Sequence, residues 1–178
     1  ILGDAGNPES YPFPVEIMTV KNAGSTDVVT DGHLSPDLCE KFIHAATELE
    51  SNGASAIVST CGFLITEQQK IAGAVNIPVM VSALSLYKKI RGEIGNKQVL
   101  IITASKPSLG LSALEAASIS KADIHVIGME KCDAFANAIL QKKEEQSLNL
   151  DTAQIERFII NEIEKACNTQ PKLGAVLL

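Results

Sequence analysis

Cys61 is the residue whose type and position point most directly to chemistry. It follows an apolar run at 56–58 and precedes Gly62, the order expected where a buried strand gives way to a helix. Ligands of open α/β sheets bind at that carboxyl edge of the strands. Backbone N–H groups at a helix start favour the thiolate, the form of cysteine that attacks or abstracts a proton. Ser59 and Thr60 beside it favour a functional cysteine, and a buried structural cysteine is the alternative interpretation.

Ser82 and Thr103 are hydroxyl residues that, like Thr60, end predicted strands. Three hydroxyls at one edge of a sheet could hold a carboxylate without a charged partner. Hydroxyls are also common at such positions because their oxygens cap the helices that follow. Both interpretations stay open for each residue.

The segment Gly3-Asp4-Ala5-Gly6-Asn7-Pro8 could bring backbone amides, a carboxylate and a side-chain amide to one point. It is not a phosphate loop, because the Gly-Lys-Ser/Thr of that motif is missing. It is not a dinucleotide fingerprint either, which needs a preceding strand and a G-x-G-x-x-G pattern. An ordinary Gly/Pro turn is the alternative.

The remaining histidines and cysteines predict no further catalytic or metal site. His33, His44 and His125 share no spacing that would support a Ser-His-Asp or Cys-His arrangement. The four cysteines form no C-x-x-C pair, which disfavours zinc and a disulfide framework. Cys39 and Cys167 lie on or beside helical apolar stripes and are predicted to pack in the core. Free thiols suggest a reducing cytoplasm.

Short β-branched runs alternate with helical stretches, the pattern of βαβ units and a mostly parallel sheet. The strands are predicted at Val15–Val20, Ala54–Ser59, Ile77–Ser82, Gln98–Thr103, Ile124–Ile127 and Leu173–Leu178. Helices are predicted after Ser35-Pro36, from about Thr66, and over Leu84–Ile94, Ser112–Ile119, Asp133–Lys142 and Thr152–Cys167, the last capped by Asp151. Gly95-Asn96 breaks the pattern and divides the chain into a first α/β lobe, 1–95, and a second, 96–178.

The composition is that of a globular protein rather than a nucleic-acid or membrane protein. Of 178 residues, 46% are hydrophobic and 20% charged, and the net charge is −6. An acidic chain is a poor partner for nucleic acid or an anionic membrane, which reward basic surfaces. No apolar run approaches the roughly 18 residues that span a bilayer. We expect a soluble, cytoplasmic protein without a metal or cofactor.

Several of these segments together resemble the aspartate/glutamate/hydantoin racemase superfamily, in its cofactor-independent branch. The resemblance runs through nearly the whole chain. It rests on the N-terminal segment with Tyr11-Pro12-Phe13-Pro14-Val15, on Ser59-Thr60-Cys61-Gly62-Phe63-Leu64, on Ile77-Pro78-Val79 with Ser82, and on Thr103, Gly128-Met129 and Gly174-Ala175-Val176-Leu177-Leu178.

This resemblance implies two pseudo-symmetric lobes with an active site in the cleft between them, and possible homodimers. It implies a racemase or epimerase of a small amino acid, related carboxylate or hydantoin, in which two cysteines exchange protons on opposite faces of the α-carbon. Cys61 is then one of the two bases. The predicted substrate-binding residues are Asp4, Asn7, Thr60, Gly62, Ser82 and Thr103.

The expected second cysteine follows the final strand in a Glu-Cys-Thr motif and would lie beyond Leu178. The resemblance therefore predicts that the chain is cut at both ends. Two alternatives are a cis–trans isomerase or decarboxylase of a dicarboxylic acid on the same fold, and a non-catalytic small-molecule-binding protein. The identity of the substrate is not readable from the residues.

Overall fold

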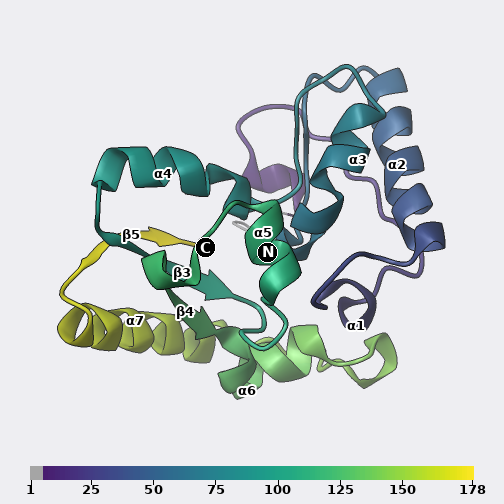
Figure 1. Ribbon diagram of the computed structural model, residues 1–178. Coiled ribbons are helices and arrows are strands. Elements are labelled where there is room, and N and C mark those ends of the chain that lie inside the picture. Colours follow the sequence, from purple (N-terminus) through teal and green to yellow (C-terminus); the bar gives the residue numbers. More distant parts are fainter. Residues whose placement is uncertain (1–5) are drawn as a thin grey trace.

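The computed structural model describes residues 6–178, in which helices alternate with strands of two parallel sheets (Figure 1). β1 (Ile57–Val58) pairs with β2 (Val79–Met80) in the smaller sheet. β3 (Gln98–Thr103) lies between β4 (Ile124–Gly128) and β5 (Leu173–Leu177) in the larger one. Every pairing is parallel. The α/β class with parallel sheets is therefore confirmed.

The helices that connect and cover these strands differ widely in length. The α-helices are α1 (Ser25–Val28), α2 (Pro36–Ser51), α3 (Gln68–Gly73), α4 (Tyr87–Ile94), α5 (Leu111–Ala116), α6 (Asp133–Phe135) and α7 (Thr152–Thr169). Shorter or irregular turns are η1 (Pro8–Ser10), η2 (Gly62–Glu67), η3 (Ala83–Leu86), η4 (Lys121–Asp123), η5 (Met129–Lys131), η6 (Ala136–Leu140) and η7 (Lys143–Glu145).

The central strand β3 is buried from both sides. Figure 1 shows α4 on one side of the three-stranded sheet and α7 along the other. Because successive residues of a strand point to opposite faces, Val99 and Ile101 pack into one hydrophobic cluster, and Leu100 and Ile102 into another. A strand covered on both faces reads as a continuous apolar run, which is why its bounds match the prediction.

The two longest helices begin where their capping residues predict. The Ser35 hydroxyl accepts a hydrogen bond from the Leu38 N–H at 3.3 Å, with Pro36 in the first helical position. The Asp151 carboxylate accepts from the Gln154 N–H at 2.9 Å. Local side-chain chemistry is sufficient to set both helix starts.

The first half of the chain departs from the predicted elements. Val15–Val20 forms no strand, and β1 and β2 are only two residues long each. The smaller sheet has no other strand among residues 6–178, and Pro78 lacks an N–H with which to extend the ladder. The helix predicted from Thr66 is preceded by the 3-10 segment η2, so that α3 begins at Gln68.

The two sheets lie on opposite sides of Gly95 in the sequence. Gly95 ends α4 with φ 62°, a conformation that glycine adopts at least cost. A division into lobes at 95/96 remains a prediction.

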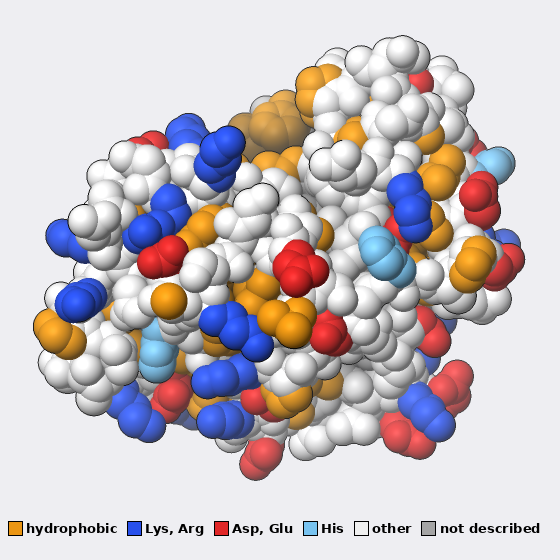
Figure 2. All heavy atoms as spheres, in the orientation of Figure 1, with side chains coloured by type: hydrophobic (Ala, Val, Ile, Leu, Met, Phe, Trp, Pro, Cys, Tyr) orange, Lys and Arg blue, Asp and Glu red, His pale blue; other side chains and the backbone are white. Residues whose placement is uncertain are grey.

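Figure 2 shows basic side chains gathered over the half of this face that holds α4 and α7, with acidic ones among them. Within the described part of the chain, no helix is both long and apolar enough to cross a membrane.

Candidate active site

Cys61 lies three residues beyond Val58, the last residue of β1, and directly before η2. The Ser59 hydroxyl accepts a hydrogen bond from the Cys61 N–H at 3.0 Å and donates to the Cys61 carbonyl at 3.4 Å. The Cys61 carbonyl also accepts from the Leu64 N–H at 3.3 Å. These bonds fix the backbone of Cys61 at the carboxyl edge of the small sheet, where the sequence places it.

The thiol of Cys61 is held mainly in its protonated form. Burial raises its pKa above the ordinary value of 9.0, while the N–H groups of Phe63 and Leu64 lower it in part. The expectation that a helix start would favour the thiolate is therefore met by two N–H donors, but desolvation outweighs them. A base at this position needs a further influence, such as a nearby cation, to ionise near neutral pH.

A cavity of about 510 Å³ opens beside Cys61. Thr60, Gly62, Ser82 and Thr103, all predicted as substrate contacts, line it together with Cys61. They come from the carboxyl ends of three strands belonging to both sheets, which is where open α/β sheets bind their ligands. The structure thus brings together five residues that are up to 43 positions apart in the sequence, from Thr60 to Thr103.

Ser82, which follows β2, lies beside Gly62, which follows β1, at this cavity. Its side chain is buried, at 3% exposure, and its oxygen accepts from the Leu84 N–H at 3.2 Å, so it caps η3. A hydroxyl that accepts one hydrogen bond still has a proton to donate. A Cβ on Gly62 would lie 3.6 Å from the Ser82 oxygen, which is ordinary contact distance. Capping and ligand binding are therefore compatible roles for Ser82.

The described lining of this cavity contains no Asp, Glu, Lys, Arg or His. Besides the hydroxyls it is formed by apolar side chains that the sequence analysis did not single out, among them Leu109, Phe135 and Ile139. Phe135 and Ile139 precede the loop that joins η6 to α7, and no local pattern marks them as facing a cavity. Such a site can bind a group of low polarity, and an aromatic face can attract a cation.

The other predicted residues lie elsewhere. The Asn7 side chain caps η1, accepting from the Glu9 N–H at 3.1 Å, and Asn7 is not among the residues lining the cavity. Asp4 lies outside the described residues. Cys39 is buried as predicted, whereas Cys167 is exposed, on the solvent side of α7. Among residues 6–178, no group of three or more His, Cys, Asp or Glu residues could hold a metal ion.

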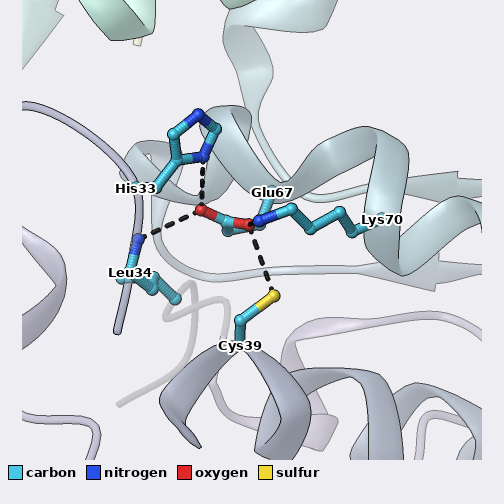
Figure 3. A network of polar contacts seen from close by, with 5 residues as sticks. All are labelled: His33, Leu34, Cys39, Glu67 and Lys70. Atoms are coloured by element: carbon cyan, nitrogen blue, oxygen red, sulfur yellow. Dashed lines mark hydrogen bonds and ion pairs between the residues drawn. The ribbon is translucent and has the colours of Figure 1, made fainter. Parts of the chain in front are cut away.

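Sequence reasoning missed one polar network near η2. The Glu67 carboxylate is fully buried and takes hydrogen bonds from His33, Leu34, Cys39 and Lys70 (Figure 3). Burial raises the pKa of Glu67, but the hydrogen bonds from these four residues together bring it down to about 2. The available signal was an acidic residue, Glu67, separated by only Thr66 from the apolar run Phe63-Leu64-Ile65.

The curated proteins with similar sequences are named as dimethylsulfoniopropionate lyases. The chain is 31% identical over 110 residues to a dimethylsulfoniopropionate lyase of Durusdinium sp. clade D, covering 61% of this chain and 36% of that protein. It is 28% identical over 109 residues to dimethylsulfoniopropionate lyase 3 of Emiliania huxleyi (strain CCMP1516), covering 61% of this chain and 28% of the relative. The chain therefore spans about a third of the length of these curated relatives. No protein-family model matches it.

These relatives contradict the racemase resemblance and the isomerase activity it implies. The decarboxylase alternative gains no support from them either. Several motifs behind the resemblance are short segments at strand ends, where many parallel α/β proteins place glycine and hydroxyl residues, and a shared fold does not fix a reaction. The relatives are named as lyases and not as racemases.

Proposed function

We propose that this chain supplies the base-bearing cavity of a lyase that acts on dimethylsulfoniopropionate or a similarly small sulfonium carboxylate. Two observations support the proposal. The similar proteins are named dimethylsulfoniopropionate lyases, and Cys61 lines a cavity whose described residues carry no charged side chain. The second observation carries most weight, because the compound joins a carboxylate and a sulfonium cation and has no net charge.

The reaction we propose is an elimination. The Cys61 thiolate removes a proton from the carbon next to the carboxylate. The electron pair of that C–H bond forms the carbon–carbon double bond, and the pair of the carbon–sulfur bond leaves with sulfur. Dimethyl sulfide and acrylate result, and Cys61 is left as a neutral thiol. The pair that leaves with sulfur neutralises the sulfonium, and acrylate keeps the carboxylate charge that the substrate already carried, so the net charge is the same before and after the reaction.

The cavity offers complementary surfaces to the two ends of such a substrate. The hydroxyls of Thr60, Ser82 and Thr103 are donors for the carboxylate, in the role predicted for them. The apolar wall around Phe135 suits the two methyl groups on sulfur. The aromatic ring of Phe135 attracts the positive charge of the sulfonium. A dicarboxylate would bring two negative charges to a lining without a described cationic partner, which is costly.

The substrate itself can assist the ionisation of Cys61. Burial holds the pKa of the free thiol high. An opposite charge within a few ångströms favours the charged form of a titratable group, and the sulfonium supplies a positive charge that the cavity walls lack. Substrate binding thus lowers the pKa of the thiol in the complex. This ties base formation to occupation of the site.

The arrangement of the chain in two lobes, 1–95 and 96–178, with the cavity between them, is part of the same proposal. Each segment contains one parallel sheet, and lining residues come from both. We keep as proposals a reducing, cytoplasmic location, based on the free cysteines, and a homodimer.

The test is the release of dimethyl sulfide from dimethylsulfoniopropionate, measured by gas chromatography, with acrylate measured in parallel. Wild-type protein is compared with Cys61→Ser and, as a matched control, Cys167→Ser on the exposed side of α7. We expect Cys61→Ser to lose about 10²–10⁴-fold in rate, as removal of a general base does, and Cys167→Ser to be unaffected. Equal rates in Cys61→Ser and wild type would rule out Cys61 as the base. No dimethyl sulfide from the wild type would refute the lyase assignment.

A further inference from the structure

The buried carboxylate of Glu67 joins four donors from separate parts of the chain. Its Oε1 atom accepts from His33 Nδ1 at 2.8 Å and from the Leu34 N–H at 3.0 Å. Its Oε2 atom accepts from Cys39 Sγ at 3.3 Å and from Lys70 Nζ at 2.8 Å. In Figure 3 the donors approach the carboxylate from the segment that precedes α2, from α2 itself and from α3. The carboxylate therefore fixes the end of η2 to the rest of this half of the protein.

Charged groups surround this carboxylate on its solvent side. The side chains of His33 and Lys70 are 64% and 54% exposed, whereas that of Glu67 is 0% exposed. Glu40 acts on Lys70 and Cys39 through its charge. A buried carboxylate without partners would cost several kilocalories per mole. With four donors it stays ionised and rigid, since each bond restrains a different direction.

The segment between Glu67 and Cys61 is unusual in its conformation. η2 runs as a 3-10 helix over six residues, Gly62–Glu67, whereas such helices rarely exceed three or four. Five consecutive residues, 63–67, are buried. Such a segment needs support at both ends. The Ser59 hydroxyl holds it at Cys61, and the Glu67 carboxylate holds it at the opposite end.

The first turn of η2 carries the groups that set the state of the thiol. The N–H groups of Phe63 and Leu64 act as hydrogen-bond donors to Cys61 and oppose the effect of its burial. The direction in which these N–H groups point depends on the backbone conformation of η2. The Leu64 N–H also donates to the Cys61 carbonyl at 3.3 Å, so a change in the winding of η2 would move these N–H groups relative to Cys61.

From this geometry we infer that Glu67 is a positioning residue for Cys61. It acts through η2 and touches neither the cavity beside Cys61 nor a ligand in it. The inference concerns the free thiol and does not depend on which substrate the protein takes.

The test is the pH profile of Cys61 alkylation by iodoacetamide in Glu67→Gln, followed at the Cys61 peptide by mass spectrometry. The matched control is Ala46→Gly, which weakens α2 at a buried position outside the network. Circular dichroism checks that both variants are folded. We expect the apparent pKa of Cys61 to rise in Glu67→Gln, with alkylation at neutral pH about tenfold slower for each pKa unit, and no change in Ala46→Gly. A folded Glu67→Gln with an unchanged or lowered profile would overturn the inference, as would an equal shift in Ala46→Gly.

Two milder variants keep the inference testable if Glu67→Gln does not fold. His33→Gln and Lys70→Met alter one donor each, and both lie on the exposed side of the network. We expect each to shift the Cys61 profile in the same direction by a smaller amount. Unchanged profiles in both would count against a positioning role. Because alkylation needs no substrate, a wild type without lyase activity would refute the proposed function and leave this test intact.

Discussion

The Asp31 carboxylate accepts a hydrogen bond from the Ser112 N–H at 3.2 Å and connects the segment before α2 to the start of α5. The same carboxylate lies against Gly110, where a Cβ would overlap it. The glycine thus leaves the space that this contact between the two halves of the sequence requires. We expect Gly110→Ala to displace Asp31 and break the bond.

Gly110→Ala should lower the free energy of unfolding by about 0.5–1.5 kcal/mol, the usual net contribution of one hydrogen bond. Asp31 is exposed and its side chain can swing aside, so the protein should still fold. Urea denaturation of Gly110→Ala, Asp31→Ala and the double variant measures the coupling. The double variant should be hardly less stable than either single one. Full additivity would show that the two residues act independently.

Ser82→Ala should impair both η3 and binding of the substrate carboxylate. Ser120 offers a matched control, because its oxygen also caps a 3-10 turn, accepting from the Ala122 N–H at 3.3 Å, but it does not line the cavity. Each substitution should cost about 1 kcal/mol in the free energy of unfolding. Only Ser82→Ala should raise KM for dimethylsulfoniopropionate, by about tenfold for a lost bond to a charged group. Equal KM values in the two variants would leave Ser82 as a cap alone.

Phe135→Leu should weaken binding of a sulfonium more than binding of its neutral analogue. Leucine keeps an apolar side chain at the cavity wall but removes the ring, whose attraction for a cation is worth about 0.5–2 kcal/mol. The matched ligands are dimethylsulfoniopropionate and 4-methylpentanoate, in which a carbon replaces sulfur. Isothermal titration with the Cys61→Ser protein, which should not consume the substrate, gives both Kd values. Similar weakening of both ligands would show that Phe135 contributes shape only.

Acid should destabilise the protein through Glu67. Its pKa in the folded protein is about 2, below the ordinary value of 4.5, so its contribution to stability is complete above pH 4.5 and disappears as the pH falls towards 2. The shift corresponds to on the order of 3 kcal/mol. Urea denaturation can be measured between pH 5 and 2, a range that spans both pKa values. The free energy of unfolding should fall more steeply with decreasing pH in the wild type than in Glu67→Gln. Parallel curves for the two proteins would contradict the low pKa.

The elements that could be predicted from the sequence are those whose signals are local. β3 is a continuous apolar run, and α2 and α7 begin at side chains that cap their own N-terminal turns. The position of Cys61 at a strand end also followed from neighbouring residues. β1 and β2 came out shorter than predicted because strand length depends on partners far away in the sequence. For the same reason, the residues near Val15–Val20 could not show that this segment lacks a partner strand.

The parts of the site that escaped prediction depend on distant contacts. The partners of Glu67 include His33 and Cys39, which lie 34 and 28 positions away, and no spacing rule connects them. Phe135 lines the cavity from the end of α6, and its neighbours in the sequence give no sign of this position. The assignment of the reaction failed for a different reason. Glycines and hydroxyls at strand ends occur in many parallel α/β proteins, so they indicate where a ligand binds but do not identify the reaction.

The protonated state of Cys61 should also slow its reaction with oxidants. Peroxides oxidise the thiolate far faster than the thiol, and a cysteine that is exposed and ionised is converted to sulfenic acid and beyond. Burial raises the pKa of Cys61 and so favours the neutral thiol. In the proposed mechanism the reactive form arises only while a sulfonium occupies the cavity and shields the sulfur. In a peroxide-rich cell, Cys61 should therefore be oxidised most slowly when the cavity is empty or filled by substrate. Its oxidation should be fastest when a foreign cation stabilises the thiolate and leaves it exposed to solvent.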